Sequence, residues 1–202
     1  MIGRKNFAQA YIVGEKVRLR PIETEDAPIA YGLLQNERVT QTILWDGPSS
    51  LNELAFSFHH RRLWWSNGEP TYTFAIEAIA GGGIIGSVEI RRELYPQQLK
   101  IGYWLGVPHW GEGFGTDAVR LATNFAFQHL EAIRVSATVF IGNEASKRVL
   151  EKNGFEFDGI SKCQVFKRGY WLDEWLYTLL WNEWQSCQHY YEPQSERVRE
   201  LL

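Results

Sequence analysis

The chain has 202 residues, of which 45% are hydrophobic and 22% are charged, and this suits one soluble domain with a core of its own. A formal net charge of −3 argues against a nucleic-acid-binding module, because such modules usually present a basic face. The two cysteines are too few for a disulfide framework, no apolar run reaches the ~18 residues of a membrane span, and no signal peptide is recognisable, so we expect a cytoplasmic protein.

Hydrophobic periodicity and turn residues divide the chain into strands and helices. In chain order, we expect a strand at 15–21, helices at about 24–36 and 51–67, strands at 72–78, 84–92 and 98–105, a helix at 116–130, a strand at 134–140, a helix at 144–152, and strands at 155–166 and 173–184. The strands flanking the helix at 116–130 must pair in parallel, whereas short links elsewhere indicate antiparallel pairs. The fold class is therefore α/β, with one domain at 15–184 between a lead-in at 1–14 and a polar tail at 185–202.

A glycine-rich turn lies between the strand at 98–105 and the next helix. Unpaired N–H groups at such a helix N-terminus can hold a phosphate, although glycines with this spacing are as often plain turn residues. A dinucleotide-binding fingerprint would need an acidic residue after the following strand, and none lies near Thr138. The helix opens with Gly115 and Thr116 but without the lysine of a P-loop. Both familiar nucleotide-binding interpretations therefore fail.

Three segments together resemble the GNAT superfamily of N-acetyltransferases, and its RimJ/RimL type most closely. They are the Gly-Tyr-Trp strand end at 102–104, the Trp-Gly-Glu-Gly-Phe-Gly-Thr-Asp-Ala loop at 110–118, and the Asn-x-x-Ser-x-Arg-Val-x-Glu-Lys-x-Gly-Phe stretch at 143–155. The resemblance implies the GNAT fold. That fold is a mixed, mostly antiparallel twisted sheet, here of about six to seven strands, with flanking helices and a splayed parallel strand pair at the cofactor slot.

The resemblance also implies acetyl-CoA as cosubstrate and no metal. In this family the pyrophosphate lies on the glycine loop, which assigns that role to Trp110, Gly111, Gly113, Phe114, Gly115 and Thr116. The backbone of Leu105 and Val107 would bind the pantetheine arm like an added strand, beside a bulge near 106–108 that opens the slot. Asn143 and Arg148 would also contact the cofactor, while Asn143 is equally a good helix N-cap.

Acetyl transfer needs a neutral amine, a polarised thioester carbonyl and a proton for the leaving thiolate. The resemblance to the RimJ/RimL type implies that Ser146, the serine of the Asn-x-x-Ser segment, is the acid. The tyrosine that some other GNAT members use falls at Leu150, so that role is absent. The general base is open: two family glutamates fall at Lys100 and Val165, and Glu89 on the neighbouring strand is our candidate. The structural alternatives are a solvent-facing Ser146 and a solvated Glu89 at a sheet edge.

The acceptor is an amine whose identity stays open. An α-amine, with a pKa of roughly 8, needs less help than a lysine side chain near 10.4, which favours a protein or peptide N-terminus. The helix at 51–67, rich in His, Arg and Trp, either borders the acceptor groove or simply packs on the core. The alternatives are a small-molecule acetyltransferase (for an antibiotic, polyamine or amino acid) and a catalytically weak acyl-CoA-binding regulatory module. A homodimer would fit the aromatic excess, and no nucleic-acid or membrane partner is expected.

Overall fold

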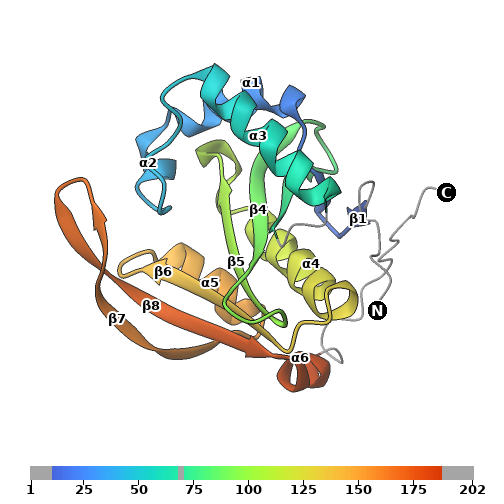
Figure 1. The fold of residues 1–202 in the computed structure, drawn as a ribbon, viewed down its shortest axis with the longest axis vertical. Coiled ribbons are helices and arrows are strands. Elements are labelled where there is room, and N and C mark those ends of the chain that lie inside the picture. The colour runs from blue at the N-terminus through green and yellow to red at the C-terminus, as the bar shows by residue number, and fades with distance from the viewer. Residues whose placement is uncertain (1–10, 68–70, 188–202) are drawn as a thin grey trace.

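A computed structural model of the protein describes residues 11–67 and 71–187. Within these ranges, one twisted sheet of eight strands has the order β1-β2-β3-β4-β5-β6-β8-β7 (Figure 1). The strands are β1 (Ile12–Val13), β2 (Val17–Pro21), β3 (Thr71–Ala78), β4 (Ile84–Arg92), β5 (Gln98–Leu105), β6 (Arg134–Phe140), β7 (Glu156–Lys167) and β8 (Tyr170–Leu180). The helices are η1 (Thr24–Asp26), α1 (Ala27–Leu34), α2 (Glu37–Thr40), α3 (Leu51–Ser66), η2 (Val107–His109), α4 (Phe114–His129), α5 (Glu144–Lys152) and α6 (Trp181–Cys187).

Strands β5 and β6 form the one parallel pair in the described sheet, and they separate after three residue pairs. The last pair joins Lys100 to Ser136. Beyond it, β5 stays in register with β4 as far as Leu105, while β6 pairs with β8 as far as Phe140. The predicted mixed sheet with a splayed parallel pair is therefore confirmed. The predicted bulge near 106–108 is wrong, because the split begins at residue 101, the β4–β5 register is regular, and the chain after Gly106 forms the short helix η2.

Helix α4 packs its apolar stripe on the inner strands β2, β4 and β5. The predicted stripe is confirmed, since all four of its members are fully or almost fully buried: Val119, Ala122, Phe125 and Ala126. Phe125 meets Phe74 of β3 edge to face, with ring centroids 5.2 Å apart. At the start of the helix, a Cβ on Gly115 would lie 3.3 Å from Cε2 of Tyr103, so this glycine allows α4 to approach β5 closely.

The strands β7 and β8 form a long hairpin whose tip returns toward the segment between α2 and α3 (Figure 1). At the tip, the buried Lys167 donates its Nζ to Oδ1 of Asp46 at 2.6 Å and to the carbonyl of Trp45 at 3.3 Å. Arg168 also donates to Oδ1 of Asp46, at 3.3 Å. These contacts hold the hairpin against the N-terminal helices, on the side where the larger cavity described below lies.

The last strand ends earlier than the sequence predicts. Strand β8 stops at Leu180, and the segment that follows, from Trp181 to Cys187, forms α6. In this helix, Trp184 stacks on Phe127 of α4 at 5.1 Å and donates its indole N–H to Asn124 at 2.7 Å. Packing on α4 thus outweighs the strand propensity of a tryptophan-rich segment. The structure also adds β1 and α2, and most of the expected polar tail lies outside the described residues.

Candidate active site

A cavity of about 420 Å³ lies between the end of β5, the glycine loop and α5. It is lined by nine of the residues that the sequence assigned to the cofactor, namely Leu105, Trp110, Gly111, Gly113, Phe114, Gly115, Thr116, Asn143 and Arg148. Ser146 lines it as well. Val107 is not among its lining residues: it packs on a second core cluster, and its carbonyl accepts the N–H of Trp110 at 3.2 Å. We therefore keep no cofactor role for Val107.

The peptide N–H groups of the glycine loop have no acceptor among the described residues. Asp117 is the first helical residue whose N–H is bonded, to the carbonyl of Gly113 at 3.1 Å. For the N–H groups of 111–116, no acceptor occurs within residues 11–67 and 71–187. Gly111 and Gly113 adopt φ of +83° and +84°, a left-handed conformation that side chains other than glycine rarely take. Six consecutive unpaired amides at a helix N-terminus fit an anion such as a diphosphate.

The loop is held in place from two sides. On one side, the indole N–H of Trp110 donates to the carbonyl of Leu105 at 2.7 Å. On the other side, Oδ2 of the buried Asp117 accepts the N–H groups of Lys16 at 2.7 Å and Val17 at 3.0 Å. The Lys16 Nζ also donates to the carbonyl of Glu112 at 2.7 Å. These contacts orient the amides before any ligand arrives, which lowers the ordering cost of binding.

The far half of β5 turns its peptide groups toward the split in the sheet. The N–H of Gly106 donates to Ile85, and the carbonyl of Gln98 accepts from Glu93, so the even-numbered residues of β5 bond to β4. Because hydrogen bonding alternates along an antiparallel strand, Tyr103 and Leu105 direct their peptide groups to the opposite edge. That edge has lost β6, so it can pair with an extended ligand as a strand would.

A second cavity of about 890 Å³ shares Tyr103, Trp104, Asn143 and Ser146 with the first. Its walls come from α3, the segment before it, and the polar face of strands β3 to β8. A ligand in the smaller cavity would therefore meet a ligand in the larger one at these shared residues.

Ser146 and Tyr103 interact at this junction. Burial raises the pKa of Tyr103 to about 12, and the hydrogen bond with the Ser146 side chain partly opposes that rise. The N–H of Ser146 donates to Oδ1 of Asn143 at 3.1 Å, so the N-cap alternative for Asn143 is observed. Ser146 lines both cavities, so it is not simply a solvent-facing helix residue.

Glu89 lines the larger cavity, but its carboxylate is already engaged. Arg61 of α3 forms an ion pair with its Oε2, and the hydroxyl of Thr73 donates to the same oxygen at 3.2 Å. If Glu89 were the base, only its Oε1 would be available to accept a proton. The guanidinium of Arg61 beside it favours the ionised carboxylate over the protonated one. The helix at 51–67 packs on the core and also lines a cavity, since Trp65 is buried against Phe74 at 4.6 Å while Arg61 lies at the cavity wall. Its role beside the acceptor stays a prediction.

Sequence reasoning overlooked Glu174 of β8. This residue is 7% exposed and lines the larger cavity, and its carboxylate has no ion pair or hydrogen bond with the part of the chain that the structure describes. It raises the pKa of Lys100 across the split, although burial of Lys100 is the larger effect and lowers that pKa overall. The available signal was the pair of carboxylates, Asp173 and Glu174, between the apolar residues of the run from Trp171 to Leu176. A buried, unpaired carboxylate in a cavity is a candidate for proton transfer.

Among the described residues, no group of three or more His, Cys, Asp or Glu side chains could hold a metal ion. No described helix combines the length and the apolar character needed to cross a membrane.

Several known proteins resemble this chain. A model of the acetyltransferase (GNAT) domain matches residues 16–156. The chain is 29% identical over 183 residues to the Bacillus subtilis protein named "Putative ribosomal N-acetyltransferase YdaF", covering 86% of this chain and 96% of that one. It is 39% identical over 116 residues to "Probable N-acetyltransferase YjcK" of the same organism, covering 55% of this chain and 63%, less than two thirds, of that relative.

The fold has a solved counterpart. The structure of Mycobacterium smegmatis RimJ in complex with CoA-disulfide superposes with a TM-score of 0.75, at 22% identity, over 87% of each chain. At this identity the likeness supports the fold alone, whereas the domain match covers more than half of the sequence. The chain therefore belongs to the GNAT family of acetyltransferases.

Proposed function

We propose that this protein transfers the acetyl group of acetyl-CoA directly to a primary amine, and that its acceptor is the α-amine of a protein or peptide N-terminus. GNAT acetyltransferases use acetyl-CoA, which supplies an activated thioester. The observation that carries the proposal is the row of unpaired loop amides at 111–116 beside a cavity that meets a second, larger one at Ser146. One cavity suits the cosubstrate and the other suits the acceptor.

The residues of the smaller cavity fit the parts of CoA. The amides of 111–116 and the positive end of the α4 dipole would hold the diphosphate, and the exposed Arg148 on the cavity wall adds a positive charge. The N–H of Leu105, directed at the split, would donate to a carbonyl oxygen of the cosubstrate. Its carbonyl is less available, because the indole of Trp110 already donates to it.

Ser146 is the proposed acid for the leaving thiolate. Its hydroxyl lies at the junction of the two cavities and interacts with the hydroxyl of Tyr103. With its pKa raised to about 12, Tyr103 stays protonated at neutral pH and can act as a donor. A proton given by Ser146 could thus be replaced from Tyr103, which makes Tyr103 a positioning and relay residue in this proposal.

Two carboxylates are candidates for receiving the amine proton. Glu89 lines the acceptor cavity, but Arg61 and Thr73 engage one of its oxygens. Glu174 lines the same cavity and has no such contact with the described residues, which favours it as the base. An α-amine needs little assistance near neutral pH, so either carboxylate would suffice through a water molecule.

The decisive experiment measures CoA binding and acetyl transfer separately. Isothermal titration of the purified full chain with CoA should give a saturable signal, and thiol release from acetyl-CoA should rise on addition of peptides with a free N-terminus. Absence of CoA binding at millimolar concentration, in a folded sample, would remove the proposal. Binding without thiol release across peptides, polyamines, amino acids and aminoglycosides would favour the regulatory-module alternative. Release with small amines alone would favour the small-molecule enzyme.

A further inference from the structure

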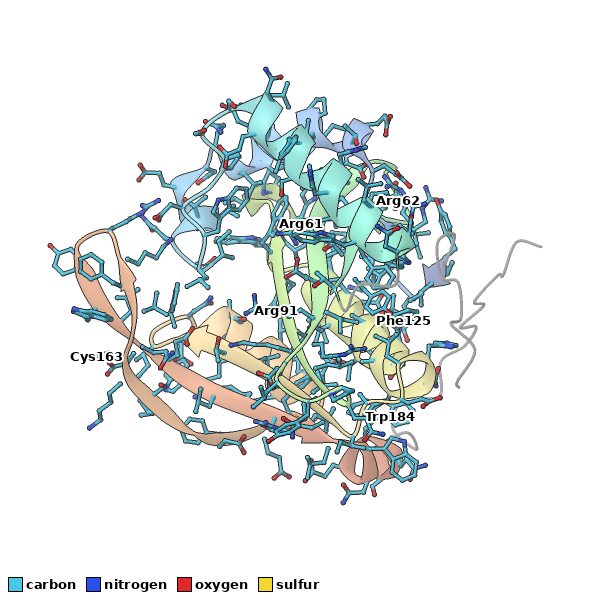
Figure 2. All side chains as sticks on the ribbon, viewed as in Figure 1. Arg61, Arg62, Arg91, Phe125, Cys163 and Trp184 are labelled. Carbon is cyan, nitrogen blue, oxygen red and sulfur yellow. The ribbon has the colours of Figure 1, made fainter. Side chains whose placement is uncertain are left out.

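Two cations stand directly opposite each other on the wall of the acceptor cavity. Arg91 of β4 is the register partner of Lys100 of β5, and both line the larger cavity. In the view of Figure 2, Arg91 lies between helix α3 and strand β6, and the residue is exposed to solvent. Like charges at directly opposite positions of antiparallel strands repel each other, so this pairing destabilises the sheet unless something offsets it.

Within residues 11–67 and 71–187, no carboxylate forms an ion pair with either cation. The side chains of Arg91 and Lys100 make no hydrogen bond with any residue in 11–67 or 71–187. Glu174 and Glu93 raise the pKa of Lys100 from a distance, but neither comes within salt-bridge range of it. Arg91 also lowers the pKa of the nearby Arg61, although burial of Arg61 is the larger cause.

The other carboxylates of the cavity are committed elsewhere. Glu89 is paired with Arg61. Glu53 accepts the N–H of Ser49 at 2.7 Å, at the start of α3. The cavity lining carries three cations and three carboxylates, so its formal charge is balanced. Of the carboxylates, Glu174 alone lacks a side-chain partner among the described residues, and neither Arg91 nor Lys100 is bonded to any of the three.

The geometry points to an acceptor that carries a carboxylate, bound by Arg91 and Lys100 while its amine reacts near Ser146. This inference rests on the proposed acetyl transfer and narrows its acceptor to acidic amines. Arginine and lysine at one point of a cavity wall suit a carboxylate, because the guanidinium can donate two parallel hydrogen bonds to it. The pair therefore acts as a specificity determinant rather than as part of the transfer chemistry.

The distance along β5 indicates where in the acceptor the carboxylate lies. Lys100 precedes Tyr103 by three residues, which corresponds to roughly 10 Å of strand. The amine and carboxylate of one amino acid are much closer together than this. We therefore assign the carboxylate to the side chain of Asp or Glu at the second or third position of a peptide, rather than to the α-carboxylate of a free amino acid.

The test compares C-terminally amidated peptides that begin Ser-Glu-Glu, Ser-Gln-Gln and Ser-Lys-Lys, with thiol release as the readout for the wild-type full chain. The acidic peptide should show a kcat/KM about tenfold above that of its glutamine counterpart, mostly through KM, and the difference should shrink at high salt. Free serine and free glutamate are tested as acceptors in the same assay. A preference for free amino acids over peptides would overturn the assignment of the carboxylate.

Variants test the two cations themselves. Arg91→Gln and Lys100→Gln should each remove most of the preference for the acidic peptide, while leaving CoA affinity and kcat at saturating Ser-Gln-Gln peptide near wild type. Arg92→Gln is the matched control, since Arg92 is the next residue of β4, is exposed, and does not line the cavity. Equal use of acidic and amide peptides by the wild type, or an equal loss in Arg92→Gln, would overturn this inference alone. A failure to acetylate any amine would instead overturn the proposed function.

Discussion

The indole N–H of Trp110 donates to the backbone carbonyl of Leu105 at 2.7 Å, and this bond closes the turn between β5 and the glycine loop. The guanidinium of Arg38 lies over the same indole ring at 5.2 Å from its centroid. The side chain of Trp110 therefore shapes the loop, and its indole N–H is not available to a phosphate. Trp110, the first residue of the glycine-loop pattern, has a structural role: it fixes the loop to the end of β5.

Replacing Trp110 with phenylalanine tests this role. The variant keeps an aromatic ring but loses the donor to Leu105, so the loop amides should be less well ordered. We expect CoA affinity to fall about tenfold, in line with one lost hydrogen bond, and the fold to persist. Isothermal titration gives the affinity, with the exposed Trp64→Phe as control. Unchanged CoA affinity in Trp110→Phe would show that the loop keeps its shape without the bond.

A carboxylate placed in the glycine loop should prevent diphosphate binding. Gly113→Asp introduces a negative charge at φ +84°, where a Cβ would lie 3.3 Å from the Lys16 Nζ. Strain and charge repulsion together should weaken CoA binding by about a hundredfold or more. Gly81→Asp is the matched control, because Gly81 lies in an exposed turn with open space around its Cα. If both variants bind CoA like the wild type, the diphosphate lies elsewhere.

The proposed roles of Ser146 and Tyr103 can be tested by their effects on kcat. Ser146→Ala should lower kcat about tenfold to a hundredfold and leave CoA affinity near wild type, because the hydroxyl is needed for the leaving thiolate and not for binding. Tyr103→Phe should lower kcat less, since it removes the relay but keeps Ser146. Assays of thiol release give kcat, and isothermal titration gives the affinity for CoA. Equal turnover in Ser146→Ala would end its assignment as the acid.

Tyr103 also predicts how stability depends on pH. Its pKa rises from 10.0 to about 12 in the folded protein, so above pH 10 the unfolded chain loses this proton first. Unfolding then releases a proton, and the free energy of unfolding should fall as the pH rises between about 10 and 12. Urea denaturation across this range should show a steeper loss for the wild type than for Tyr103→Phe. Parallel curves for the two proteins would contradict the burial of the phenol.

Asp117 should stabilise both the fold and the glycine loop. Its carboxylate accepts two backbone N–H groups from Lys16 and Val17 and pairs with Arg120 at 2.6 Å. Asp117→Asn should lower the free energy of unfolding by about 2–3 kcal/mol, because hydrogen bonds to a charged acceptor are lost at a buried site. Urea denaturation measures the change, with Glu112→Gln in the same loop as control. An unchanged midpoint for Asp117→Asn would mean that the backbone alone holds the loop.

The two candidate bases can be separated by amide substitution. Glu174→Gln should lower kcat for peptide acetylation at neutral pH by about tenfold, and the loss should shrink as rising pH deprotonates the amine without help. Glu89→Gln should have a smaller effect on kcat, because Arg61 and Thr73 already engage its carboxylate. Initial rates of thiol release from pH 6 to pH 9 distinguish the two. The reverse order of effects would return the base role to Glu89.

Local sequence patterns were sufficient for most of the fold. The predicted strands at 84–92, 98–105 and 134–140 and the helix at 144–152 have the bounds seen in the structure. Alternating apolar residues and an Asn N-cap are properties of neighbouring residues, so they can be read without knowing the tertiary contacts. The glycine loop was recognisable for the same reason, because left-handed turns at Gly111 and Gly113 depend on residue type at those positions.

The errors occurred where distant segments decide the outcome. The segment after Leu180 folds as a helix because Trp184 finds Phe127 and Asn124 on α4, which its own sequence cannot reveal. We expected β5 and β6 to separate near residue 106, but they separate after Lys100. The point of separation depends on how far β5 stays paired with β4, which the sequence of β5 does not reveal.

The amino-acid sequence alone determined the family pattern, the cofactor loop and the candidate acid, because each depends on residues close together in the chain. Only the tertiary structure decided the acceptor side. Strand register sets Arg91 opposite Lys100, the packing of α3 couples Arg61 to Glu89, and the order of β6, β8 and β7 brings Glu174 to the same cavity. Charge at this site is a sum over side chains from separate elements, and that sum exists only once the sheet has assembled.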